Sequence, residues 1–260
     1  MSYLQRLITL NPVFHKEMRT RWRGRKLYLI PGLAFGGLLA LLIVTMLPGA
    51  FDRDWFFDVY PSIAAFLAYF IAGAIALLAT PGLTAGSLAV ERANLTLDAL
   101  VLTRLSTWQI IMGKFAAGMV PVLLSFLPCL SIASFMSLLA VVSDSEDFFT
   151  EFYNLHAYLQ WITVPLIALA AGALGTAVSA FCRQLRSAMA WAYGLTLTLY
   201  FGVQHGPTIL AMIGLIDFER PSELADFLTL TVVPWCIYAL VAVAAIRLAH
   251  WRLHTEPSRD

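Results

Sequence analysis

Side chains that could do chemistry are few in this sequence, and their spacing forms no catalytic pattern. His250 and His254 are four residues apart and would share a helix face, but no carboxylate accompanies them as in a zinc-protease HExxH motif. Gly113 and Lys114 lack the upstream glycine and the following Ser or Thr of a phosphate-binding loop. The three cysteines are too far apart for a metal site or a disulfide framework. We therefore expect no catalytic residue, metal site or cofactor in this chain, and any ATP hydrolysis would need another chain.

The most informative pattern lies in residues 91–114. Asn94 can cap a short helix. The apolar residues of that helix share one face: Leu97, Leu100 and Val101. Ser106 and Gln109 have the spacing of a capping box, which restarts a helix. We expect a short transverse helix held between two long ones, where it could receive force from a partner.

An amphipathic helix is predicted over residues 11–23. Asn11 suits the N-cap, and Pro12 suits the first helical position. The apolar residues recur every four positions: Phe14, Met18 and Trp22. The charged residues Lys16, Arg19 and Arg23 lie off that stripe. This pattern is typical of a helix in the membrane interface; a basic segment that only fixes topology is a compatible alternative.

The composition indicates the class of protein to which these two segments belong. Apolar residues make up 60% of the 260 residues, charged residues make up 13%, and the mean hydropathy is +0.76. In a typical soluble protein about 45–50% of the residues are apolar and about 25% are charged. The net charge of +1 gives no basic field for nucleic acid. The chain is predicted to be a polytopic membrane protein that contacts lipid, and neither a soluble enzyme nor a nucleic-acid-binding protein.

Six stretches are long and apolar enough to cross a bilayer, which takes about 20 residues. They are residues 27–47, 61–89, 110–142, 157–181, 187–203 and 228–248. Pro81 and Pro128 are candidate kink sites. The fold expected is an all-α integral membrane protein with six transmembrane helices. Its parts are an N-terminal interfacial helix (1–26), a six-span membrane domain (27–248) and a cytoplasmic tail (249–260).

The charges predict the orientation of these spans. With the N-terminus inside, every Lys and Arg except Arg53 and Arg220 is cytoplasmic, and most acidic residues lie outside. This asymmetry follows the positive-inside rule. Both termini are therefore expected in the cytoplasm.

The two polar segments resemble the permease subunits of type-2 ABC transporters. The loop residues that match in order and spacing are Glu91, Thr96-Leu97-Asp98, Leu100, Thr103, Leu105-Ser106 and Gly113-Lys114. The N-terminal residues that match are Asn11-Pro12, Lys16-Glu17, Arg19, Arg21 and Arg23. Two positions depart from the family pattern: Leu95 stands where glycine is usual, and Arg104 where proline is usual.

The resemblance implies a coupling helix that seats in a cleft of a cytoplasmic ABC ATP-binding subunit. Two copies of that subunit, with ATP and Mg bound to them, would serve a permease dimer made with a second copy or a paralogue in the plasma (inner) membrane. Glu91 would lock the coupling helix against basic residues of the interfacial helix. The coupling residues would be Glu91, Thr96, Leu97, Asp98, Leu100, Thr103, Arg104 and Leu105. The interfacial helix would use Asn11, Pro12, Phe14, Lys16, Glu17, Met18, Arg19, Arg21 and Trp22.

Small residues at helical spacing predict close helix packing. The glycines expected to pack, within the chain in preference to across a dimer, are Gly32, Gly36, Gly82, Gly86 and Gly175. Residues 208–216 are apolar but too short to span, which favours a re-entrant or interfacial hairpin on the outside.

The function expected is export, because the external loops are short for docking a substrate-binding protein and the family consists mostly of exporters. Two alternatives stay open. One is a scaffold or sensor subunit of an ABC-like complex that transports nothing, and the other is an autonomous channel or carrier.

Overall fold

The computed structural model describes residues 11–23, 26–46, 60–96, 105–142, 148–205 and 231–255. Every regular element in these ranges is helical, as the sequence predicts. The elements are α2 (Pro12–Arg23), α3 (Lys26–Met46), α4 (Tyr60–Ala74), η2 (Ile75–Ala79), α5 (Thr80–Thr84), α6 (Ala89–Ala93), α8 (Thr107–Val142), α9 (Phe148–Phe181), α10 (Leu185–Gln204) and α13 (Val233–Thr255).

Four helical stretches among the described residues are long and apolar enough to cross a membrane. They are Phe66–Ala93, Thr107–Ile132, Trp161–Phe181 and Val233–Thr255, and a shorter apolar helix covers Pro31–Val44. Each of the six predicted spans overlaps a helix, but their number as membrane crossings and their orientation stay predictions. The predicted outer hairpin at 208–216 lies outside the described residues.

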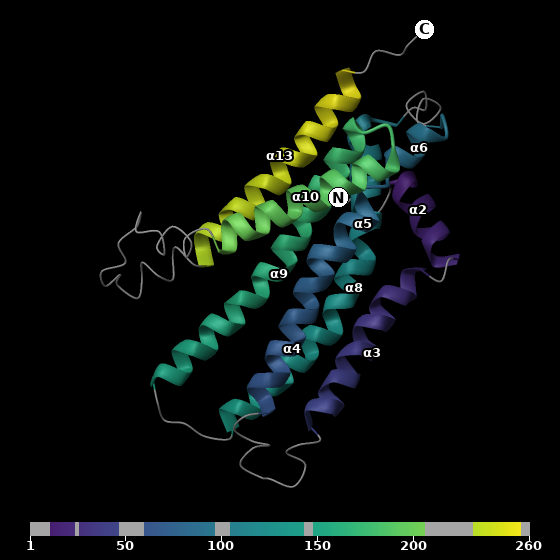
Figure 1. Cartoon of the computed structure of the whole chain (residues 1–260). Helices are drawn as coiled ribbons and strands as arrows, with labels where there is room; N and C mark the ends of the chain where they lie inside the picture. Colours follow the sequence, from purple (N-terminus) through teal and green to yellow (C-terminus); the bar gives the residue numbers. More distant parts are fainter. Residues whose placement is uncertain are drawn as a thin grey trace.

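Helix α9 is the centre of the bundle. Figure 1 shows α3, α4, α8 and α9 running alongside one another, with α10 and α13 on one flank and α2 and α6 together at one end. The apolar stretch of α9 is 72% buried inside the chain, against 22% for that of α13. Helix α9 therefore contacts protein on most sides, whereas α13 presents most of its surface outward.

Small side chains set the distance between the central helices. Helix α4 and the π-helical turn η2 bury a stripe of alanines four residues apart, namely Ala64, Ala68, Ala72 and Ala76. Because membrane helices associate through packing rather than hydrophobic burial, such stripes allow close backbone approach.

Three of the five predicted packing glycines lie at close contacts inside the chain. A Cβ on Gly82 would lie 2.7 Å from the Tyr193 hydroxyl, and one on Gly86 would lie 3.1 Å from Leu185 Cδ1. A Cβ on Gly175 would overlap the Thr84 side chain. For the Gly32 and Gly36 pair, by contrast, no described atom lies within 4 Å of such a Cβ. The expectation that this pair packs inside the chain finds no support among the described residues.

The second predicted span is broken by a π-helical turn, η2, just before Pro81. Proline in a helix removes a backbone hydrogen bond and crowds the preceding turn, and π-turns are one way a helix absorbs an irregularity. The Tyr193 hydroxyl of α10 donates a hydrogen bond of 2.8 Å to the Leu78 carbonyl in this turn. Pro81 therefore lies at a real irregularity, whereas Pro128 lies inside α8, which stays helical from Thr107 to Val142.

Candidate functional site

The short helix α6 ends in a tight left-handed turn. The amide of Thr96 donates to the Glu91 carbonyl at 2.9 Å, and the amide of Leu95 donates to the Arg92 carbonyl at 3.2 Å. This pair of bonds is a Schellman motif. Leu95 adopts φ = 57°, in the left-handed region that favours glycine. The turn thus gives a physical reason for a glycine at the position where this chain has leucine.

Asn94 has a different place from the one expected. It is the C-cap residue of α6, so among the described residues it ends a helix rather than starting one. The transverse helix itself would include Leu97, Asp98, Leu100, Thr103 and Arg104, and all of these lie outside the described residues.

An ion-pair network joins α2, α6 and α8. The Lys114 ammonium of α8 lies 2.8 Å from Oε1 of Glu91 in α6 and 3.0 Å from Oε1 of Glu17 in α2. The Lys114 side chain is only 2% exposed. A buried ammonium must be paired and hydrogen-bonded to be tolerated, so this lysine holds both carboxylates in place.

The partner of Glu91 differs from the expected one. Among the described residues its carboxylate pairs with Lys114 of the long helix α8, and α2 contributes an acid, Glu17, rather than a base. The other oxygen of Glu91, Oε2, is buried without a hydrogen-bond partner among the described residues. The network is therefore centred on Lys114, and loss of this one side chain would remove the ion-pair partner that the two carboxylates share.

Helix α2 docks on α8 through its capped N-terminus. The Asn11 carboxamide oxygen accepts the Val13 amide at 3.0 Å, which is the predicted N-cap. The Asn11 amide nitrogen donates to the Gln109 carbonyl at 2.6 Å. Gly113 permits this approach, because a Cβ there would lie 3.0 Å from Asn11 Nδ2 and from Val13 Cβ.

The rest of α2 is amphipathic, as predicted. Val13 belongs to the core and Phe14 and Met18 are half-buried, whereas Pro12, Lys16 and Arg19 are exposed. The side chain of Trp22 lies outside the described part of the chain.

Arg21 is the inward-facing base of this helix. Burial lowers the pKa of its guanidinium, and the nearby Glu17 carboxylate opposes this change. Its Nη2 lies 3.5 Å from the Leu83 carbonyl at the end of α5. Helix α2 therefore faces both α8 and the end of the second apolar stretch.

Arg92 links α6 to α9. Its Nη1 donates a hydrogen bond of 2.8 Å to the Ala180 carbonyl in the last turn of α9. A displacement of α6 would thus be transmitted to α8 through Glu91 and to α9 through Arg92.

The start of α8 confirms the predicted capping box. The Gln109 amide donates to the Ser106 hydroxyl at 3.2 Å, and the Ser106 amide donates to Gln109 Oε1 at 3.0 Å. Leu105, just before it, is half-buried against the core. Both sides of the undescribed segment 97–104 are therefore anchored.

Sequence reasoning placed Gln109 in the capping box and Lys114 in the matched family pattern, but it predicted no ion pair for Lys114 and no role for Arg92. A usable signal was present for Lys114, because a lysine within an apolar helix needs a counter-charge. The described residues hold no group of three or more His, Cys, Asp or Glu that could bind a metal. His250 instead packs edge-on against Trp108, with ring centroids 5.4 Å apart.

Comparison with known protein families identifies the family to which this chain belongs. Residues 11–202 match the family model described as ABC-2 type transporter. A comparison with the curated proteins found no match. The match covers more than half of the chain and includes α2, α6, the start of α8 and the ion-pair network. This chain belongs to the ABC-2 type transporter family, whose members form the membrane permease part of ABC transporters.

Proposed function

We propose that this chain is the permease subunit of an ATP-driven exporter that works with two copies of a separate ATP-binding subunit. The family membership supports a transport role and association with such a subunit. The observation that carries the coupling mechanism is the ion-pair network of Glu17, Lys114 and Glu91. It joins the helix that precedes segment 97–104 to the one that follows it.

Segment 97–104 is proposed as the contact with the ATP-binding subunit. It is held by α6 on one side and by the capping box of α8 on the other. In this account Leu97, Asp98, Leu100 and Arg104 touch the ATP-binding subunit. Thr96 holds the turn through its bond to Glu91, and Thr103 and Leu105 seat the end of the segment.

Movement of that segment would spread through rigid connections. Helix α8 has 36 residues, which corresponds to about 54 Å at about 1.5 Å per residue and exceeds a hydrocarbon core of about 30 Å. A tilt applied at Lys114 would therefore reach the far side of the membrane. The interfacial helix α2 would move with it, because Asn11 and Glu17 are bonded to α8.

The chain is proposed to bind neither ATP nor Mg itself, with both held by the partner subunit. A dimer with a second permease copy or a paralogue is also proposed. The support for a dimer contact on α3 is that Gly32 and Gly36 face no described side chain while several large apolar residues of α3 are exposed. The proposed location is the plasma (inner) membrane with both termini in the cytoplasm.

Site-specific photo-crosslinking tests the coupling assignment. A photoreactive amino acid replaces Asp98 in the tagged full-length chain, and the cross-linked protein is identified by mass spectrometry. The matched control places the same amino acid at Asp58, which the charge pattern assigns to the outside. An ATP-binding subunit trapped from Asp98 and not from Asp58 supports the proposal; a subunit trapped equally from both, or from neither, contradicts it.

The two alternatives predict other outcomes. An autonomous channel or carrier would trap no ATP-binding subunit and would conduct or transport alone in liposomes. A scaffold or sensor subunit would trap the ATP-binding subunit, but ATP would drive no movement of solute across the membrane.

A further inference from the structure

A wide apolar groove opens between α10 and α13, away from the coupling site. Helices α10 and α13 both pack on α9 but barely touch each other. The space left between them has a volume of about 640 Å³. That volume falls in the range of about 300–1,000 Å³ that is typical of small-molecule sites.

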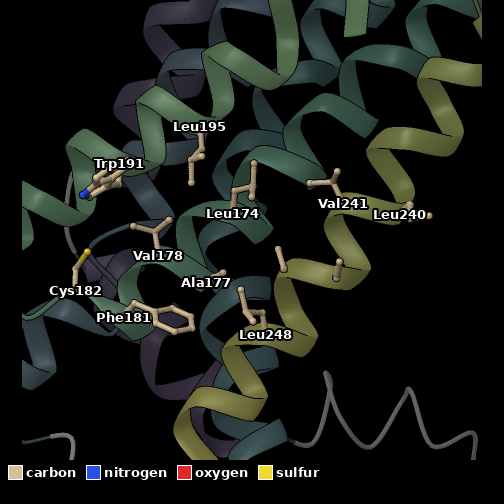
Figure 2. A pocket seen from close by; sticks show the side chains of 12 residues that line it. Leu174, Ala177, Val178, Phe181, Cys182, Trp191, Leu195, Leu240, Val241 and Leu248 are labelled. Atoms are coloured by element: carbon tan, nitrogen blue, oxygen red, sulfur yellow. The ribbon is translucent and has the colours of Figure 1, made fainter. Parts of the chain in front are cut away.

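The groove has almost no polar atoms in its wall. Figure 2 shows Leu174 and Phe181 of α9, Trp191 and Leu195 of α10, and Leu240 and Leu248 of α13 around the space. All lining residues are hydrocarbon or aromatic except Cys182. Transfer of such apolar surface out of water is favourable, so an alkyl chain is a better occupant of this open groove than water.

One end of the groove carries positive charge. Arg183 directly follows the lining residue Cys182, and Arg247 directly precedes the lining residue Leu248. Arg186 is the second residue of α10, five residues before the lining residue Trp191. All three arginines are exposed. Arg183 lies in the short link between α9 and α10, and helices α10 and α13 contain no acidic residue, so neither of these two helices supplies a counter-charge.

This end belongs to the same side of the bundle as the coupling site. Arg92 of α6 reaches the Ala180 carbonyl of α9, two residues before the lining residue Cys182. Arginine forms paired hydrogen bonds with phosphate, and basic pockets between membrane helices bind anionic lipid headgroups. An apolar groove that ends in arginines therefore suits both parts of one anionic phospholipid, the acyl chain and the phosphate headgroup.

We propose that the groove binds one anionic phospholipid, with an acyl chain against Leu174, Leu195 and Leu248 and the phosphate on the three arginines. The inference goes beyond the proposed function; only the leaflet of origin, the cytoplasmic one, rests on the orientation proposed above. A lipid held here would fill the gap between α10 and α13 and would set how far these two helices can approach each other.

The test uses the purified full-length chain in phosphatidylcholine nanodiscs. The probe is phosphatidylglycerol with a photoreactive diazirine on its acyl chain, and the comparison probe is phosphatidylcholine with the same chain. After illumination, cross-linked peptides are mapped by mass spectrometry. The expected result is phosphatidylglycerol attached to residues 174–195 and 240–248, well above the phosphatidylcholine signal.

Variants separate the acyl-chain slot from the headgroup site. Ala244→Trp fills the slot, whereas its control Ala190→Trp adds the same ring to an exposed position of α10 outside the lining. We expect the first to abolish the cross-links and the second to keep them. Combined Arg183→Gln, Arg186→Gln and Arg247→Gln should remove the preference for phosphatidylglycerol, whereas the exposed control Arg19→Gln should not.

Three results would overturn the proposal: equal labelling by the two lipids in the native chain, labelling that is unchanged in Ala244→Trp, or labelling scattered over all helices. A native chain without cross-links, together with an Ala244→Trp chain that changes from dimer to monomer, would assign the groove to a second copy instead. No ATP or ATP-binding subunit enters the measurement. Failure of the lipid site and failure of the proposed function are therefore distinguishable.

Discussion

Lys114 Nζ lies 2.8 Å from Glu91 Oε1, although the two residues belong to helices on opposite sides of the loop that the family resemblance assigns to coupling. The same nitrogen lies 3.0 Å from Glu17 Oε1. One buried ammonium thus joins three elements that would otherwise be independent. The position of α6 is thereby tied to the position of α2 and to the long helix α8.

Replacing Lys114 should be strongly destabilising. Lys114→Met removes the shared counter-charge of two partly buried carboxylates, and loss of such a charged hydrogen-bond partner costs about 1–3 kcal/mol of unfolding free energy. The measurement is unfolding in mild detergent, and Lys16→Met on the exposed face of α2 is the control. Adding Glu17→Gln to Lys114→Met should recover part of the loss. Equal stability of the Lys114 and Lys16 variants would show that the ion-pair network does not contribute to the unfolding free energy.

Gly113→Ala should loosen the docking of α2. The new methyl group would lie 3.0 Å from both Asn11 Nδ2 and Val13 Cβ, and overpacking of this kind costs about 1–3 kcal/mol. Hydrogen–deuterium exchange should become faster across 12–23. Gly194→Ala, for which no atom of the described residues lies within 4 Å of the added carbon, should leave exchange there unchanged. Unchanged protection of α2 in Gly113→Ala would mean that the cap is not held by α8.

Leu95→Gly should stabilise the turn after α6. Leucine at φ = 57° carries strain of about 1–2 kcal/mol that glycine avoids. The side chain is 81% exposed, so little packing is lost. Thermal unfolding of the purified chain should shift upward for Leu95→Gly and stay near the native value for Leu95→Ala, which keeps the strain. A downward shift for glycine would show that the leucine side chain makes a contact that matters more than the strain.

Tyr193→Phe should destabilise the contact between α10 and the π-helical turn. The substitution leaves the Leu78 carbonyl without its donor, at a cost of about 0.5–1.5 kcal/mol. Tyr200→Phe serves as the matched control, since the Tyr200 hydroxyl forms no hydrogen bond with any residue that the structure describes. Identical unfolding curves for the two variants would remove this bond from the account.

Local features were predictable from the sequence because their causes are local. The Asn11 N-cap, the Ser106–Gln109 capping box and the amphipathic face of α2 depend on residues within one or two turns. The partner of Lys114 was not predictable in this way, since Glu17 is 97 residues away in the chain. The loop that carries Glu91 was identified, but the identity of its counter-charge depends on how α2, α6 and α8 pack.

The glycines show the same limit. Gly32 and Gly36 have the same spacing as Gly82 and Gly86, yet among the described residues only the second pair meets close neighbours. A spacing pattern marks a face that permits close approach, whereas the neighbouring helix decides whether the approach occurs. The π-helical turn likewise receives a hydrogen bond from Tyr193, which lies more than a hundred residues beyond it in the chain and could not be paired with it from the sequence.

The central claim, that this permease is driven through α6 and segment 97–104 by a separate ATP-binding subunit, is tested most directly by co-purification. The tagged chain is isolated from its native membrane in mild detergent, and the proteins that accompany it are identified and quantified by mass spectrometry. The account predicts a stoichiometric partner with a phosphate-binding loop. Isolation of this chain alone, both in detergent and in nanodiscs, would contradict it.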